Sequence, residues 1–253
     1  MNAIGAVMYR EYKIRITSLM WLFYDLLMPF AYLLIFGIGL DRAFTSGVVV
    51  QGSLVSYNEF FLAGVLSMAC FGIAINTSYG FFIDRDNGIF YEFLTYPMTR
   101  GEFLLGKIMF NCLTAITQAM IAVALGSVVL GIPVRWEFFP LVLVGVSLGT
   151  AGWFFFLAIF ALRIRRNDMF NTFINVAYFI LMFVSSMFYP LDPMPAWLRN
   201  ASYLNPITWH TDALRYFTIG VGEFATVALE AGAFFVFLVA SFIGAVKTLQ
   251  RMS

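Results

Sequence analysis

The stretch FFPLVLVGVSLGTAGWFFFLAIFAL, residues 138–162, decides the fold class of this chain. It carries no charged side chain. It is also longer than the roughly 20 apolar residues that a helix needs to cross about 30 Å of hydrocarbon. Because backbone N–H and C=O groups in lipid must bond within their own segment, we predict a membrane-spanning helix here and not a strand.

The whole chain has the composition of a membrane protein. Of its 253 residues, 61% are hydrophobic and only 11% are charged, whereas soluble domains average about 45–50% and about 25%. It contains 30 Phe, 12 Tyr and 5 Trp but only 15 basic and 14 acidic residues. That is too little polar surface for a globule in water, so lipid is the expected surrounding. The net charge of +1 gives no basic field that would attract nucleic acid.

Five further stretches are similar to the first in length and apolar character. We therefore predict six transmembrane helices, at residues 18–40, 58–82, 103–130, 138–162, 169–189 and 224–246. The first stretch has no small-residue cleavage site and is longer than a signal-peptide core, so we expect it to be retained.

The distribution of Lys and Arg predicts the orientation of these spans. Placing the N-terminus in the cytoplasm puts eleven basic residues inside and leaves four outside, Arg42, Arg135, Arg199 and Arg215. Such a bias follows the positive-inside rule. We expect a multi-pass protein of the cytoplasmic (inner) membrane with both termini in the cytoplasm.

Three segments lie outside the predicted spans. Residues 1–17 mix basic and apolar side chains, which is typical of a helix lying in the membrane interface. Residues 83–102 form a charged cytoplasmic loop. Residues 189–222 are too apolar for a free loop and too rich in proline for a span, which favours short external re-entrant helices. The predicted fold class is an all-α polytopic membrane protein with one domain over residues 1–253.

Two motifs that suggest chemistry are weak. The stretch 101–107 matches the first part of a phosphate-binding loop, but Ile108 replaces the Ser or Thr that would hold magnesium and no strand precedes it. His210 is the only histidine, and Cys70 and Cys112 lie in apolar runs, so a metal site has almost no material. We expect no catalytic residue, no metal and no cofactor bound by this chain.

The charged cytoplasmic loop is more informative because it also carries an apolar stripe. Asp84, Asp86 and Glu92 are interleaved with Phe90 and Tyr91. Contact with water alone does not explain such a stripe, so we interpret this loop as a docking surface for another protein.

Two motifs give the chain a specific resemblance. DRDNG at 84–88, followed by EFL at 92–94, Pro97, Arg100 and LGK at 105–107, resembles the coupling-helix region of ABC-2 type transporter permeases. NPITWHTDALR at 205–215 resembles the signature before the last helix of these proteins. The most similar subgroup is that of the daunorubicin-type and nodulation-factor-type exporters. Two departures are Ile89, where a small hydroxyl residue is common, and the absence of proline at 62–64.

The resemblance implies partners and roles. The permease of this family has no ATPase of its own, forms a dimer with a second copy, and docks on two copies of a separate ABC ATPase that binds ATP and Mg. The implied ATPase-coupling residues are Asp84, Arg85, Asp86, Gly88, Phe90, Tyr91 and Glu92. The second and fifth spans are expected to line the substrate path through Phe60, Phe61, Phe71, Phe179 and Phe183. The expected external gate comprises Asn205, Pro206, His210, Asp212 and Arg215.

Asp25 is a carboxylate within the first predicted span. Such a group is costly in hydrocarbon and is by default a functional candidate. It also lies near the basic entry segment and is able to pair with Arg10, Lys13 or Arg15 as their side chains extend toward the interface. Both interpretations stay open.

These observations favour a permease subunit of an ATP-driven exporter. The abundance of aromatic residues along the spans predicts an amphipathic or hydrophobic substrate such as a drug, a lipid or a lipid-linked glycan. Two alternatives are an intramembrane lipid-modifying enzyme and a channel or receptor that needs no ATP. The first requires catalytic side chains around His210 that face a wet cavity, and the second leaves the docking loop without a purpose.

Overall fold

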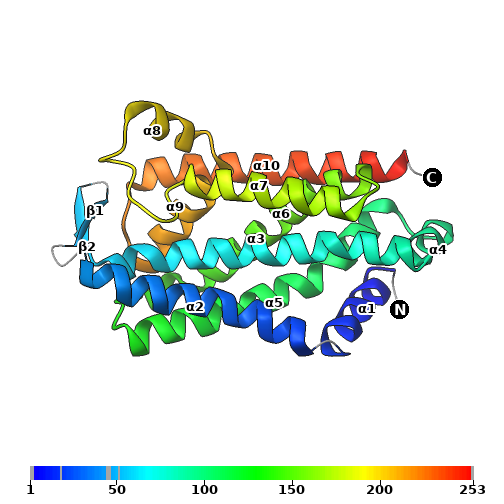
Figure 1. Cartoon of the computed structure of the whole chain (residues 1–253), viewed down its shortest axis with the longest axis horizontal. Coiled ribbons are helices and arrows are strands. Elements are labelled where there is room, and N and C mark those ends of the chain that lie inside the picture. Colours follow the sequence, from blue (N-terminus) through cyan, green and yellow to red (C-terminus); the bar gives the residue numbers. More distant parts are fainter. Residues whose placement is uncertain (1–2, 18, 44–46, 51, 252–253) are drawn as a thin grey trace.

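A bundle of long helices makes up the body of the protein, seen in a computed structural model that describes residues 3–17, 19–43, 47–50 and 52–251 (Figure 1). Five long helices and the shorter α7 run along the bundle in the described part of the chain: α2 (Leu19–Ala43), α3 (Tyr57–Asp86), α5 (Arg100–Val129), α6 (Phe139–Arg163), α7 (Asn167–Phe183) and α10 (Phe224–Gln250). The shorter elements are α1 (Ala3–Thr17), α4 (Ile89–Thr95), the 3-10 turn η1 (Trp136–Phe138), α8 (Ala196–Tyr203) and α9 (Pro206–Ile219). This architecture confirms the predicted all-α polytopic fold class.

Four helices among the described residues are long and apolar enough to cross a membrane. They are α3, α5, α6 together with η1, and α10. In α2 the described apolar part runs from Leu27 to Asp41. Asp25 lies on α2, but its side chain is outside the described part of the chain, so both interpretations of this carboxylate stay predictions.

Helix α7 ends at Phe183, before the predicted boundary at residue 189. Its last carbonyl groups are satisfied by side chains instead of by a further turn. The Asn205 amide donates to the carbonyls of Leu181 and Val184, and the Ser185 hydroxyl donates to Met182 O at 2.6 Å. Helix α7 is therefore a short helix of 17 residues, or about 25 Å at 1.5 Å per residue.

Helix α3 forms the centre of the bundle and packs against α2, α5, α6 and α9. In its most apolar 18-residue window 78% of the residues are buried, compared with 22% in α10. Helix α10 therefore presents most of its apolar surface outward, as expected for a helix that faces lipid. Gly64 lets α3 lie close to the segment after α7, because a Cβ there would be 2.4 Å from Met187 O.

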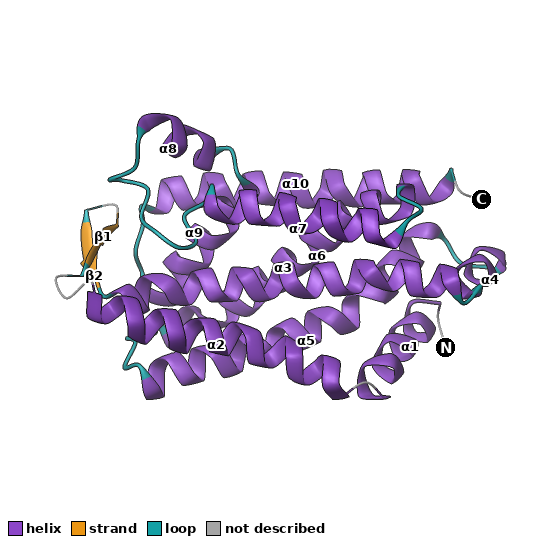
Figure 2. Cartoon of the chain, in the orientation of Figure 1, coloured by secondary structure: helices purple, strands orange, loops and turns teal. Residues whose placement is uncertain are grey.

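The two ends of the bundle carry different elements. Helices α1 and α4 lie at one end together with both chain termini, while α8 and α9 lie toward the other end (Figure 1). At that second end an antiparallel hairpin, β1 (Val48–Val50) and β2 (Ser53–Val55), joins α2 to α3 (Figure 2). This hairpin was not predicted from the sequence. Both described termini lie at the same end, which agrees with an even number of crossings.

Candidate coupling and translocation sites

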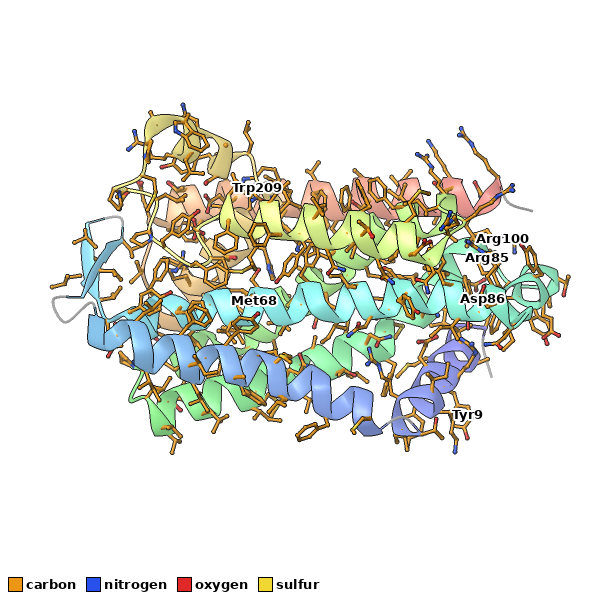
Figure 3. All side chains as sticks on the ribbon, in the orientation of Figure 1. Tyr9, Met68, Arg85, Asp86, Arg100 and Trp209 are labelled. Atoms are coloured by element: carbon orange, nitrogen blue, oxygen red, sulfur yellow. The ribbon has the colours of Figure 1, made fainter. Side chains whose placement is uncertain are left out.

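Helix α4 is a short element that projects from the end of α3. Gly88 has a φ of 74°, a left-handed conformation that lets the chain leave α3 and start α4 without the strain that a side chain would impose. After α4, Thr99 and Glu102 form a reciprocal capping box that starts α5. Local sequence thus produces a helix–turn–helix projection, with Arg85 and Asp86 at its base (Figure 3).

The predicted coupling residues divide into an exposed and a buried group. Asp86, Gly88, Tyr91 and Glu92 are exposed, with Tyr91 at 56%. Phe90 is fully buried, and its ring meets the Phe81 ring edge-on at 6.3 Å. The predicted apolar stripe is therefore split, because Tyr91 points outward while Phe90 anchors α4 to α3.

Four charged side chains connect α1, α3 and α5 at the base of this projection: Arg10, Glu11, Asp84 and Lys107. We call them the four-charge cluster. Lys107 Nζ lies 3.0 Å from Glu11 Oε1 and 3.1 Å from Asp84 Oδ2. Arg10 pairs with the same two carboxylates, at 3.2 Å for Glu11 Oε1. The cluster is neutral in total, and Lys107, Asp84 and Glu11 are buried. Such pairing is what makes buried charges tolerable.

Helix α1 lies unusually close to α5 beside this cluster. A Cβ on Gly106 would be 2.7 Å from Val7 Cβ and 2.9 Å from Ile4 O. Gly106 and Lys107, the residues that imitate a phosphate loop, thus have structural roles here: one allows the contact and the other forms the ion pairs.

Arg85 fastens the end of α3 to the end of α6. Its guanidinium donates to Ile164 O at 3.1 Å and to Ala161 O at 3.2 Å, carbonyls that end α6. The same group lies 5.7 Å from the Phe90 ring. Arg85 and the four-charge cluster both join the end of α3, where α4 begins, to neighbouring helices. The exposed coupling residues therefore lie on an element that is firmly attached to the bundle.

The predicted gate residues all lie at α9, and all but the half-buried Pro206 are buried. Asn205 accepts from Ile207 N at 3.0 Å and begins the helix, and Pro206 occupies its first turn, where a missing N–H costs nothing. His210 Nε2 is 3.1 Å from Gly145 O, and its Nδ1 is 3.0 Å from Ser67 Oγ. Because a carbonyl only accepts, Nε2 carries the proton and Nδ1 accepts from the serine hydroxyl.

The glycines of α6 make room for this histidine. A Cβ on Gly149 would be 2.1 Å from His210 Nε2. Gly149 therefore allows α9 to pack closely against α6.

Asp212 and Arg215 form a buried ion pair one turn apart on α9. Arg215 also donates to Ser186 O at 2.7 Å and lies 4.1 Å above the Phe60 ring, while Ser186 Oγ donates to Asp212 Oδ1 at 2.6 Å. The pair therefore ties α9 to α3 and to the segment after α7.

The predicted path residues are only partly brought together. Phe60, Phe61 and Phe71 are 0%, 0% and 2% exposed, whereas Phe179 and Phe183 are 60% and 41% exposed. The first three pack inside the chain in this conformation. Phe188, which the sequence analysis did not select, joins the two groups, with ring centroids 5.5 Å from Phe61 and 5.6 Å from Phe183.

A cavity of about 480 Å³ lies among α2, α3, α5 and α7. Its lining mixes apolar residues with the amides of Asn76, Gln118 and Asn175, and it includes Phe179. Gln118 is 2% exposed, and neither atom of its amide has a hydrogen-bond partner among the described residues. Sequence alone did not reveal this amide, because a single Gln in an apolar span gives no periodic signal. A second cavity of about 710 Å³, lined by Phe183 and Phe188, opens beside the β1–β2 hairpin.

These elements define an all-α polytopic membrane protein with the short projecting helix α4 at one end and the largely buried helix α9 toward the other. Residues 2–219 match the family described as ABC-2 type transporter. The chain belongs to this family, which confirms the resemblance found in the two motifs.

Three relatives illustrate the similarity. The chain is 26% identical over 200 residues to the putative transport permease ycf38 of Cyanophora paradoxa, covering 76% of this chain and 65% of that protein. It is 28% identical over 165 residues to the probable multidrug ABC transporter permease YbhR of Escherichia coli (strain K12), covering 62% and 43%. For the daunorubicin resistance ABC transporter permease protein DrrB1 of Streptomyces coeruleorubidus the identity is 27% over 206 residues, covering 80% and 70%. The matches span less than two thirds of the first two relatives.

Proposed function

We propose that this chain is the permease subunit of an ATP-driven exporter in the cytoplasmic membrane. In this proposal two copies of the chain form a dimer, and two copies of a separate ABC ATPase bind ATP and Mg and dock at the α4 end, which faces the cytoplasm. The observation that carries the proposal is the exposed face of α4. There Tyr91 and Glu92 stand on a short helix that is firmly joined to the central helix of the bundle.

The contacts at the base of α4 connect its exposed face to several other helices. Arg85 joins α3 to α6, and the four-charge cluster joins α3 to α1 and α5. A push on α4 by the ATPase is therefore passed to these helices together and not lost in a loop. Because a ligand shifts a two-state element only by its differential affinity, ATP must favour the outward-open state of the complex.

The cavity among α2, α3, α5 and α7 supports an amphipathic or hydrophobic substrate, such as a drug, a lipid or a lipid-linked glycan. Its wall is mostly apolar, and amides such as Gln118 supply hydrogen-bonding groups. Pockets of this kind orient a ligand with few polar contacts. The side chains of Phe179 and Phe183 are exposed in this conformation, so they are the first of the predicted path residues that a substrate meets. Phe60, Phe61 and Phe71 require a rearrangement before they contact it.

The names of two relatives, a probable multidrug permease and a daunorubicin resistance permease, support transport of such compounds. An intramembrane enzyme has less support. Both ring nitrogens of His210 are already bonded to Ser67 and Gly145, and Asp212 is bonded to Arg215 and Ser186. These side chains support the packing of α9 instead.

The proposal is tested by capturing a candidate ABC ATPase with tagged permease in lipid nanodiscs. We expect Glu92→Arg and Tyr91→Ala to lose the ATPase and its permease-stimulated activity while their thermal midpoints stay near that of the parent. Glu137→Arg is the matched control, because it reverses an exposed carboxylate at the start of α6, at the other end of the bundle. Phe90→Asp is not a suitable variant, since it places a charge in the buried base of α4.

Two outcomes would overturn the proposal. If the two α4 variants capture the ATPase as well as the control does, α4 is not the docking element. If substrate flux into vesicles continues without any ABC ATPase present, the chain acts as a channel.

A further inference from the structure

A pocket of about 660 Å³ lies where α3, α6 and α10 reach the α4 end of the bundle. Four arginines line it, Arg85, Arg163, Arg165 and Arg251, and Tyr91 and Thr248 lie beside them. Arg85 is seen at this end of the bundle in Figure 3. No Asp or Glu is among the residues that line this pocket.

The positive charge of this pocket is not neutralised within the described part of the chain. None of the four arginines forms an ion pair there, whereas the neighbouring Arg166 pairs with Asp168 at 2.5 Å. A guanidinium does not lose its proton in a protein, so deprotonation cannot relieve the repulsion among the four groups. Arg163, Arg165 and Arg251 are exposed, so an anion that reaches this surface is able to pair with them.

Arg85 is held in place at the wall of this pocket. Its two terminal nitrogens are held by the carbonyls at the end of α6, and its buried Nε has no hydrogen-bond partner among the described residues. Its position is thus fixed before a ligand arrives. A planar guanidinium matches the oxygens of a phosphate group, to which it donates two parallel hydrogen bonds.

The position of the pocket along the helices points to the source of the phosphate. Its lining comes from the last turns of three helices long enough to span a membrane, which end at Asp86, Arg163 and Gln250, together with Tyr91 of α4 and the residues Arg165 and Arg251 just beyond α6 and α10. The ends of such helices lie at the level of the lipid headgroups. Basic pockets between spans on the cytoplasmic side are suited to anionic headgroups.

We propose that this arginine pocket binds the phosphate headgroup of an anionic phospholipid in the leaflet at the α4 end. The class of ligand is a phosphodiester with one net negative charge or more. Because Tyr91 of α4 also lines the pocket, a bound headgroup lies beside the coupling helix. An effect of this lipid on ATPase coupling rests on the proposed function, but binding of the lipid does not.

The test measures how short-chain phosphatidylglycerol affects the thermal midpoint of the purified full-length chain in an uncharged detergent. Native mass spectrometry then counts the lipid that stays bound. Short-chain phosphatidylcholine and inorganic phosphate are the comparison probes. We expect phosphatidylglycerol to raise the midpoint saturably at concentrations at which the other two have little effect.

Variants locate the binding site. Arg163→Gln combined with Arg251→Gln should weaken phosphatidylglycerol binding at least about tenfold, because hydrogen bonds to a charged group are lost. Arg165→Gln should weaken it as well. Arg166→Gln is the matched control, since it removes the same charge from the same turn but outside the pocket. Arg85 is left intact because its substitution would also disturb the end of α6.

Several results would overturn the proposal. Equal binding of phosphatidylglycerol and phosphatidylcholine removes the requirement for an anion, and an equal loss in Arg166→Gln shows a diffuse charge effect. Saturation by inorganic phosphate at the same concentration identifies a site for free anions instead of lipid. If the pocket variants keep phosphatidylglycerol but lose the ABC ATPase, the arginines pair with carboxylates of that partner. None of these measurements depends on transport, so their failure is distinct from failure of the proposed function.

Discussion

The contacts of the four-charge cluster allow the loss of stability in Lys107→Met to be predicted quantitatively. This change keeps most of the side-chain volume but removes one of the two cations, leaving Glu11 and Asp84 with Arg10 alone. Lys107 is 1% exposed, so bulk water cannot replace it without rearrangement of α1. We therefore expect a large loss of stability, although the residue lies far from any predicted substrate contact.

The magnitude follows from the two contacts of Nζ, at 3.0 Å and 3.1 Å. With an effective dielectric constant of about 20, each pair contributes about 5 kcal/mol of Coulomb attraction. Desolvation of the ammonium group offsets much of this gain, and removing one partner of a buried ion pair costs about 3–5 kcal/mol in total. At about 2–4 °C per kcal/mol for a chain of this size, the thermal midpoint should fall by roughly 6–20 °C.

The assay is the thermal midpoint from intrinsic fluorescence in detergent and in nanodiscs. Arg166→Gln is the control, because its ion pair with Asp168 is exposed and should contribute at most about 1 kcal/mol. Lys107→Met combined with Glu11→Gln restores charge balance and should recover part of the loss. The reasoning is refuted if Lys107→Met costs no more than Arg166→Gln, or if the combined variant is less stable by the sum of its single changes.

Three further predictions use the same thermal assay. Gly149→Ala should destabilise the protein by about 1–3 kcal/mol, because its Cβ would lie 2.1 Å from His210 Nε2. The control Gly232→Ala, whose Cβ would have nothing within 4 Å, should be neutral or stabilising. Equal effects of the two changes would contradict the close approach of α9 to α6. Arg215→Met should cost about 3–5 kcal/mol because it leaves a buried carboxylate without its cation; a loss below 1 kcal/mol would show that the pair is not important for packing. Gln118→Leu should stabilise the fold by about 1–3 kcal/mol, because a buried amide without a partner among the described residues is removed. The same change should lower the flux of an amphipathic dye. Destabilisation would mean that the amide has a partner in lipid.

The sequence by itself determined the surroundings and the class of this protein. Composition and the length of the apolar runs are local quantities, and a backbone in lipid must satisfy its own hydrogen bonds. The run at 138–162 therefore predicted a helix correctly without any knowledge of its neighbours. The motifs at 84–88 and 205–215 predicted the family for a similar reason, because they are contiguous in the chain.

The details of the candidate sites depended on which helix faces meet, and this is where prediction from sequence stopped. Phe90 and Tyr91 are neighbours in the chain and were assigned one role, yet Phe90 is fully buried and Tyr91 is exposed. The sequence predicted that Phe60, Phe61 and Phe71 line the substrate path, but they are buried because α3 lies at the centre of the bundle.

Only the tertiary structure decided the buried polar contacts. Glu11 and Lys107 are 96 residues apart in the chain, and Ser67 and His210 are 143 residues apart. Nothing in the spacing of such residues indicates that they will meet, because their contact is the result of several helices packing at once. The sequence sets which stretches are apolar enough to enter lipid, and the packing among the helices decides which polar groups find a partner inside them, since an unpaired charge is too costly in a membrane interior.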